Sequence, residues 1–121
     1  MSRHRRKILI VDDQLDLCEA LCEILTQEGY DSQCAENGQE ALNNLKARKV
    51  HLILLDWQMP IMGGAEFLAR RKASVILARI PVIVLSAAAN LQSLLAAAGV
   101  PFIQKPIDLT TLLAAIDRLI I

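Results

Sequence analysis

The chain has no excess of charge of either sign. Among its 121 residues, 13 are Lys or Arg and 13 are Asp or Glu, so the formal net charge is zero. This balance argues against a nucleic-acid-binding surface, and we expect no direct nucleic-acid binding. The one basic cluster lies at residues 3–7, and we interpret residues 1–7 as a solvated tail. Because 54% of the residues are hydrophobic, disorder is excluded and residues 8–121 can form one domain with its own core.

Long hydrophobic runs are also missing. The basic start leads into only four apolar residues before two aspartates, so we expect no secretory leader. No residue between Arg79 and Lys105 is charged, but prolines, a glycine and polar side chains divide this stretch into short elements. Since a helix needs about 20 consecutive apolar residues to cross a bilayer, we predict no membrane span and a cytoplasmic location.

Cysteine is scarce, with three residues at positions 18, 22 and 34. The odd count favours reduced thiols, as in a cytoplasmic protein, over a disulfide framework. Cys18 and Cys22 are four residues apart in a predicted helix, where they could in principle bind a metal. No further Cys or His follows at a ligand spacing, so we interpret them as small buried hydrophobic residues.

Short apolar runs alternate with segments of helical periodicity. Strands are predicted at 8–11, 32–35, 51–55, 82–85 and 102–104. Helices are predicted at 15–28, 39–47, 63–73 and 90–98, and after Asp108. This alternation gives a parallel sheet with helices on both faces. The predicted fold class is therefore α/β, a doubly wound, five-stranded parallel sheet in which 32–35 is an edge strand.

Polar side chains stand at the ends of four of these strands. Asp12 and Asp13 follow the first strand, Asp56 the third, Ser86 the fourth and Lys105 the fifth. Ligands of doubly wound sheets bind at the carboxyl ends of the strands, near the point where the strand order reverses. The arrangement predicts a functional site, although each residue also has a simpler interpretation, such as a helix cap for an aspartate or a surface position for the lysine.

The loop after the first predicted strand contains no glycine. A dinucleotide-binding fold would place glycines there so that backbone amides could hold phosphate, which excludes that class. If Asp12, Asp13 and Asp56 lie about 5 Å apart, each pair repels by roughly 3 kcal/mol at an effective dielectric constant of about 20. Lys105 offsets only one of the three charges. Either a carboxyl group is protonated or a divalent cation binds, and hard carboxylate ligands favour Mg²⁺ over zinc.

With a cation bound, Asp56 could act as a nucleophile toward a phosphoryl group. The cation would neutralise charge on the transferring oxygens, while Lys105 and the Ser86 hydroxyl would hold the others. We therefore predict Asp56, Ser86 and Lys105 as the catalytic residues of a phosphoryl-accepting site.

Four motifs, in order and at fitting separations, make the chain resemble the receiver domains of two-component response regulators. They are ILIVDD at 8–13, LDWQMPIMGG at 55–64, PVIVLSA at 81–87 and FIQKP at 102–106. The resemblance covers essentially the whole chain. It implies a flavodoxin-like, CheY-like fold and a role in a two-component phosphorelay.

The resemblance also assigns roles at the site. Asp56 would accept a phosphoryl group from a histidine kinase or phosphotransfer protein. Mg²⁺ would be bound by Asp12, Asp13, Asp56 and the backbone carbonyl of Gln58.

A conformational switch is implied as well. Ser86 would follow the phosphoryl group, and Phe102 would swing inward with it, although Phe102 could equally be a plain core residue. The Lys105–Pro106 peptide bond would be cis, which proline permits at modest cost. The face made by the fourth helix, fifth strand and fifth helix would then control an output partner or a fused effector domain.

The stretch 80–104 departs from the family pattern. The interval from Ser86 to Lys105 is a few residues short, so we expect a trimmed fourth helix or following loop. Because this stretch has no charged residue to form ion pairs between copies, we hypothesise an apolar contact surface for a partner or for a homodimer. Gly63 stands where the family often has an acidic residue.

Two other functions share part of this pattern. A degenerate receiver would bind partners without phosphorylation, but the predicted site is complete. A phosphatase of the haloacid-dehalogenase type would have a second aspartate two residues after Asp56, where this chain has Gln58. We therefore expect a switch that phosphorylates and dephosphorylates itself, and not an enzyme with a separate substrate.

Overall fold

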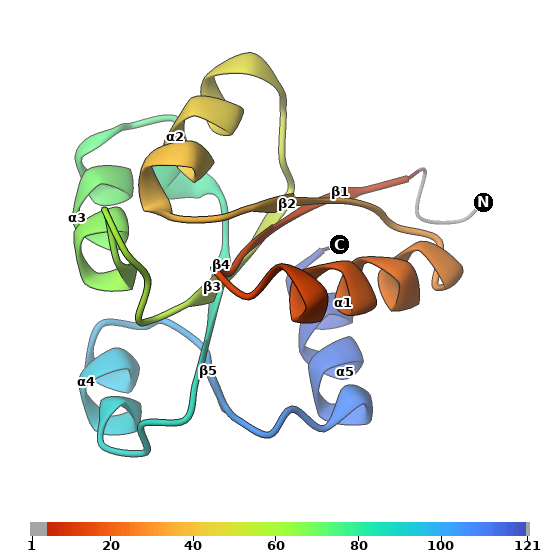
Figure 1. Cartoon of the computed structure of the whole chain (residues 1–121). Coiled ribbons are helices and arrows are strands. Elements are labelled where there is room, and N and C mark those ends of the chain that lie inside the picture. The colour runs from red at the N-terminus through yellow and green to blue at the C-terminus, as the bar shows by residue number, and fades with distance from the viewer. Residues whose placement is uncertain (1–4, 121) are drawn as a thin grey trace.

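The computed structural model describes residues 5–120 of the chain. These residues form strands and helices that alternate along the chain (Figure 1). The strands are β1 (Lys7–Val11), β2 (Asp31–Ala35), β3 (Leu52–Asp56), β4 (Val82–Ser86) and β5 (Phe102–Gln104). The helices are α1 (Leu15–Gln27), α2 (Gly38–Ala47), α3 (Gly64–Ala73), the short 3-10 helix η1 (Leu77–Arg79), α4 (Leu91–Ala97) and α5 (Leu109–Leu119).

All five strands lie parallel in one sheet, in the order β2-β1-β3-β4-β5. The chain winds outward from β1 to β2 and then in the opposite direction from β3 to β5, so the strand order reverses between β1 and β3. The predicted doubly wound, five-stranded parallel sheet is confirmed, and β2 is an edge strand as expected. The crevice at this reversal lies at the carboxyl ends of β1 and β3.

Helices cover both faces of the sheet, with α1 and α5 on one face and α2, α3 and α4 on the other (Figure 1). Alternate side chains of each strand point to opposite faces, which creates two cores. Ile8 and Ile10 pack in the core that contains Leu112 of α5. Leu9 and Val11 pack in the core that contains Phe67 of α3.

Strand β3 is buried on both faces. Residues 52–55 are each 0% exposed, as expected for a central strand of a parallel sheet. Burying a side chain of this size contributes about 1.5–3 kcal/mol, so β3 is firmly fixed in the sheet. Asp56 is the last residue of this strand, and its backbone position is therefore set by the core beneath it.

The cysteines differ from the sequence prediction. Cys18 of α1 and Cys34 of β2 form a disulfide, with their Cα atoms 6.1 Å apart, and Cys22 is a free thiol. The prediction of three reduced thiols is therefore wrong. An odd count leaves one cysteine over but does not prevent the other two from pairing, and α1 packs across β2 so that the two positions meet.

The segment between α3 and β4 was not anticipated from the sequence. It contains η1, and the guanidinium of Arg71 donates to the carbonyl oxygens of Ile80 (2.7 and 3.0 Å) and Ala78 (3.2 Å). Burial lowers the pKa of Arg71. A three-residue helix has no periodicity for a sequence pattern to reveal.

Strand β1 begins one residue earlier than expected, and helix α4 is short. β1 begins at Lys7, which the sequence analysis placed in the basic tail; residues 1–4 of that tail lie outside the described part of the chain. α4 has seven residues, fewer than any other α-helix described. Within residues 5–120, no helix is long and apolar enough to cross a membrane.

Candidate phosphoacceptor site

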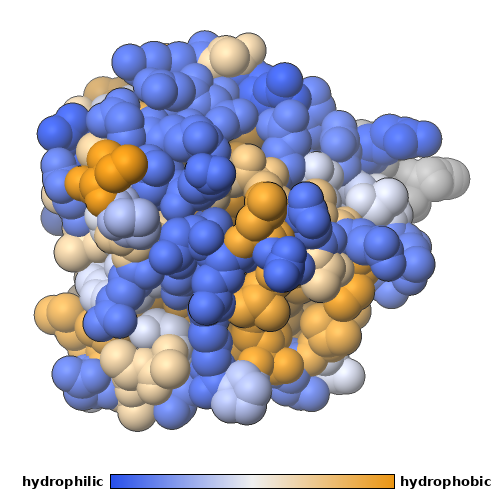
Figure 2. All heavy atoms as spheres, in the orientation of Figure 1, coloured by the Kyte–Doolittle hydropathy of each residue, from blue (hydrophilic) through white to orange (hydrophobic). Residues whose placement is uncertain are grey.

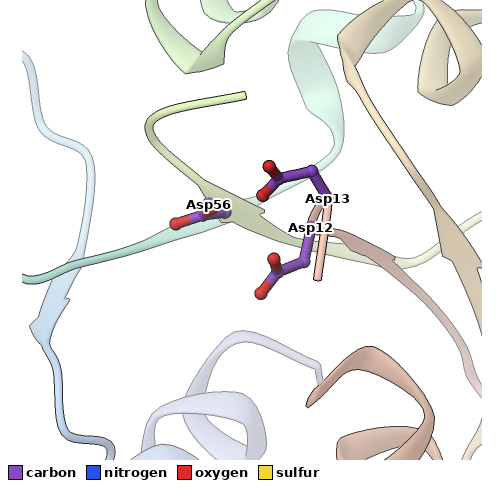
Figure 3. A group of neighbouring side chains, drawn as sticks. All are labelled: Asp12, Asp13 and Asp56. Atoms are coloured by element: carbon purple, nitrogen blue, oxygen red, sulfur yellow. The ribbon is translucent and has the colours of Figure 1, made fainter. Parts of the chain in front are cut away.

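Three carboxylates meet at the crevice between β1 and β3 (Figure 3). One oxygen from each of Asp12, Asp13 and Asp56 lies within 4.8 Å of the others. Asp12 is buried, Asp56 is partly buried and Asp13 is exposed to solvent. The cluster therefore has a protein side and an open side, from which a ligand can approach.

The sheet register sets this arrangement. Val11 pairs with Leu55, so the residues that follow β1 lie beside Asp56 at the end of β3. The N–H of Asp12 donates to the carbonyl of Ala35 on β2 at 3.0 Å. The side chain of Asp12 in turn accepts the N–H of Gln14 at 2.9 Å. We call residues 12–14 the acidic loop; these bonds fix its backbone and the carboxylate of Asp12 relative to the sheet.

Lys105 is the cation of the site. Its Nζ lies 3.2 Å from Oδ1 of Asp56 and 3.8 Å from Oδ2 of Asp12. The backbone N–H of Lys105 donates to the carbonyl of Ser86 at 2.9 Å, and the Lys105–Pro106 peptide bond is cis. One ammonium group thus faces three carboxylates, which leaves the cluster with uncompensated negative charge.

The pKa of Asp12 depends mainly on burial and in part on this charge imbalance. Burial is the main factor that raises the pKa of Asp12 above its ordinary value of 3.8, and the N–H of Gln14 acts against it. The charges of Asp56 and Asp13 raise the pKa further, while Lys105 lowers it. A group of oxygen ligands with surplus negative charge is the donor set that Mg²⁺ prefers, so the residues present fit a divalent cation.

A pocket of about 510 Å³ opens above the cluster. Its lining comprises Asp13, Gln14, Asp56, Gln58, Ser86, Ala87, Ala88 and Lys105. Ser86 is 5% exposed, and its Oγ accepts the N–H of Ala88 at 3.1 Å. The structure therefore brings together the predicted metal-binding and catalytic residues.

Phe102 does not lie in this pocket. It is half-buried on β5, where it pairs with Val84 and packs against the core on the α4 side of the sheet. Val84 and Ser86 are two residues apart on β4, so their side chains point to the same face. Phe102 therefore lies on the same face of the sheet as the side chain of Ser86.

The loop between β3 and α3 has features that sequence reasoning missed. The N–H of Gly64 donates to the carbonyl of Trp57 at 2.8 Å, and a Cβ on Gly64 would lie 2.7 Å from a ring carbon of Trp57. Ile61 has a φ of 67°, which is in the left-handed region, and it is 82% exposed. The Gly-Gly pair was the available signal for close packing, whereas nothing in the sequence marks the left-handed conformation at Ile61.

A second groove, mostly apolar and of about 330 Å³, lies between α1 and the start of α5. Leu17 and Leu21 of α1 line one side, and Ile107 and Leu109 line the other. Hydrophobic residues gather over this part of the surface in Figure 2. Lys105 also lines the groove, which places this apolar surface directly beside the carboxylate cluster.

The sequence matches the family described as response regulator receiver domain over residues 8–117. The chain belongs to this family. Among curated relatives of this receiver domain, the transcriptional regulatory protein CrdR of Helicobacter pylori is 34% identical over 117 residues, which is 94% of this chain and 54% of CrdR. The phosphate regulon transcriptional regulatory protein PhoB of Escherichia coli is 37% identical over 82 residues, covering 68% of this chain and 36% of PhoB. The chain thus spans about half the length of CrdR, and less of PhoB.

Solved structures give the same assignment for the receiver domain. A signal receiver domain of a histidine kinase from Syntrophus aciditrophicus is 32% identical with a TM-score of 0.86, covering 95% of this chain and 89% of that one. The response regulator TrrA of Thermotoga maritima, in complex with Mg²⁺ and BeF, is 30% identical with a TM-score of 0.84, covering 94% and 98%. The fold is therefore that of CheY-like receivers, and receivers of this family take phosphoryl groups from histidine kinases and link to effector domains.

Proposed function

We propose that this receiver domain is a Mg²⁺-dependent phosphoacceptor switch in which Asp56 is the residue that becomes phosphorylated. The observation that carries the proposal is the contact of 3.2 Å between Lys105 and Asp56, within 4.8 Å reach of two further carboxylates. A carboxylate placed in this way at an open pocket can be a nucleophile, because Lys105 contacts one of its oxygens and leaves the other accessible.

The residues around the pocket have different roles in this proposal. Asp12, Asp13, Asp56 and the backbone carbonyl of Gln58 would hold Mg²⁺. When bound, the ion supplies positive charge for the oxygens of the phosphoryl group. Each of these residues lies at the cluster or lines the pocket, and none offers a nitrogen or sulfur ligand.

Asp56 performs the covalent step. Lys105 engages Oδ1 of Asp56, which leaves Oδ2 free to attack phosphorus. The new bond joins Oδ2 to phosphorus as the bond between phosphorus and a histidine nitrogen of the donor breaks, and the donor imidazole keeps the electron pair. Lys105 and the Ser86 hydroxyl then hold oxygens of the transferred group, after the hydroxyl gives up its bond to the N–H of Ala88.

The conformational change begins at Ser86 and is transmitted through the sheet. A movement of Ser86 toward the phosphoryl group frees space on the face of β4 that Phe102 borders, and Phe102 moves inward. The result is a shift of α4, β5 and α5, which controls an output partner or a fused effector domain. Hydrolysis of the aspartyl phosphate returns the switch to its starting state, and no separate substrate is turned over.

The surface supports protein partners. The apolar groove beside Lys105 offers a docking face to a histidine kinase or phosphotransfer protein in the cytoplasm. The uncharged stretch 80–104 presents Leu94, which is 62% exposed, as part of a contact surface for an output partner or a second copy. No direct contact with nucleic acid is part of this proposal, because the net charge of the chain is zero.

Intact-mass measurement after incubation with acetyl phosphate and Mg²⁺ tests the proposal. We expect a labile gain of one phosphoryl group that requires Mg²⁺, disappears in Asp56→Asn and persists in Asp16→Asn. Asp16 is a matched control, since it is an exposed aspartate of α1 outside the cluster. No gain from acetyl phosphate, phosphoramidate or a phosphorylated kinase would identify a degenerate receiver, and rapid release of free phosphate would identify a phosphatase; either result contradicts the proposal.

A further inference from the structure

Helix α1 and strand β2 contact each other through two neighbouring pairs of side chains. Cys18 and Cys22 are one turn apart on α1, and Cys34 and Ser32 are two residues apart on β2. Cys18 is bonded to Cys34, while Sγ of Cys22 lies 2.8 Å from Oγ of Ser32. The third thiol therefore has its own partner and faces a hydroxyl, so the geometry selects one pair among the three cysteines.

The two residues of the pair differ in exposure. Cys18 is 1% exposed and lies in the core, whereas Cys34 is half-buried on an edge strand. Their Cα separation of 6.1 Å is within the range that a disulfide spans without backbone movement. An oxidant or a dithiol can thus reach the pair at Cys34, and closing or opening the bond needs no rearrangement of the fold.

The pair is also tied to the acidic loop. The N–H of Cys18 donates to the carbonyl of Gln14 at 3.1 Å, at one end of the loop. At the other end, the N–H of Asp12 donates to the carbonyl of Ala35, the residue that follows Cys34. A bond between Cys18 and Cys34 therefore joins the two segments that hold the acidic loop from either side.

We propose that Cys18 and Cys34 are a reversible thiol oxidation site, and that the disulfide restrains the acidic loop. In the oxidation, two thiols lose two protons and two electrons to form the S–S bond, and one hydrogen peroxide is reduced to two waters. A dithiol reverses the reaction by thiol–disulfide exchange. Disulfides in cytoplasmic proteins are usually transient, and only this expectation of reversibility rests on the proposed function.

Oxidation of the folded domain by hydrogen peroxide tests the site. The reduced protein should lose the mass of two hydrogen atoms, and peptide mapping should find Cys18 linked to Cys34 with Cys22 still open to alkylation. Dithiothreitol should restore both thiols without unfolding the domain. Cys22→Ser should behave like the parent chain and Cys34→Ser should form no intramolecular bond. A link through Cys22, a link between two chains, or a link formed only in denaturant would overturn the proposal.

The restraint on the loop has its own readout. The disulfide joins residues 16 positions apart in the sequence, and closing a loop of this length should raise the thermal midpoint by roughly 10 °C over the reduced form. Amide exchange at Asp12 and Cys18 should slow more than at Ala98 of α4, which lies away from the disulfide. Equal changes at all three amides would refute the local restraint. The test is separable from the phosphorylation test, because Asp56→Asn leaves both thiols and their bond unaffected.

Discussion

Removing the charge of Asp13 should make the domain more stable when no divalent cation is present. Asp13→Asn leaves two carboxylates beside the one ammonium group of Lys105. A substitution at a cation-binding residue would usually be expected to weaken the protein. Here the stability should rise, because Asp13 repels the neighbouring carboxylates when no cation is bound.

The magnitude follows from the geometry. Carboxylate oxygens within 4.8 Å of one another repel by about 3 kcal/mol per pair at an effective dielectric constant of about 20. Since Asp13 is exposed, solvent screens most of this repulsion, and we expect the free energy of unfolding to rise by about 1 kcal/mol. Cation binding to the parent chain should add about 1.4 kcal/mol at ten times its dissociation constant. Cation binding should stabilise the Asp13→Asn variant much less, because one ligand of the cation is lost.

Urea denaturation in EDTA and in MgCl₂ measures both effects. Asp16→Asn is the control: it removes the same charge near the start of α1 but outside the cluster, so it should give no increase in EDTA and keep the full response to Mg²⁺. The reasoning is refuted if Asp13→Asn is less stable than the parent chain in EDTA, or if Mg²⁺ stabilises both equally.

Three further predictions concern the scaffold of the domain. Ile61→Gly should raise the free energy of unfolding by about 1 kcal/mol, because a branched side chain is strained at a φ of 67°, whereas Ile76→Gly, at a φ of −72°, should lower it. Urea denaturation of the two exposed-isoleucine variants checks the opposite signs. Gly64→Ala should cost about 1–3 kcal/mol, because the added Cβ would lie 2.7 Å from a tryptophan ring carbon. Gly63→Ala, with its nearest neighbour at 3.3 Å, should cost less in the same assay. Burial and nearby positive charges lower the pKa of His51 below 6.5, so the unfolded chain binds that proton more tightly and stability should fall as pH drops below about 6.5. His51→Asn, which can still accept the backbone N–H that Nδ1 accepts, should flatten this dependence in denaturation curves at pH 5–7.

The sequence predicted the fold because local patterns and global topology agree. Strands β1, β3, β4 and β5 contain short apolar runs, whereas β2 (DSQCA) is weakly patterned. Each predicted strand and helix is present within two residues of its expected ends. Polar residues after four of these strands marked the site, because parallel strands bring their carboxyl ends to one edge of the sheet. The assumed spacing of about 5 Å between the carboxylates agrees with the structure, in which one oxygen of each lies within 4.8 Å of the others.

Features that depend on packing between elements could not be found in this way. The disulfide forms because α1 packs against β2 with Cys18 next to Cys34. The odd number of cysteines had instead suggested reduced thiols. The conformation of Ile61 is imposed by the loop that leads from β3 into α3. Likewise, the family resemblance implied a switch role for Phe102, but the sequence could not show that this residue lies outside the pocket, half-buried against the core.

The claim that Asp56 accepts the phosphoryl group is tested most directly by locating the modification. After treatment with acetyl phosphate and Mg²⁺, borohydride reduces an aspartyl phosphate to homoserine, and peptide sequencing by mass spectrometry identifies the converted residue. The account predicts homoserine at position 56 and at neither position 12 nor position 13. Conversion at another aspartate, or none in a protein that has gained a phosphoryl group, would contradict it.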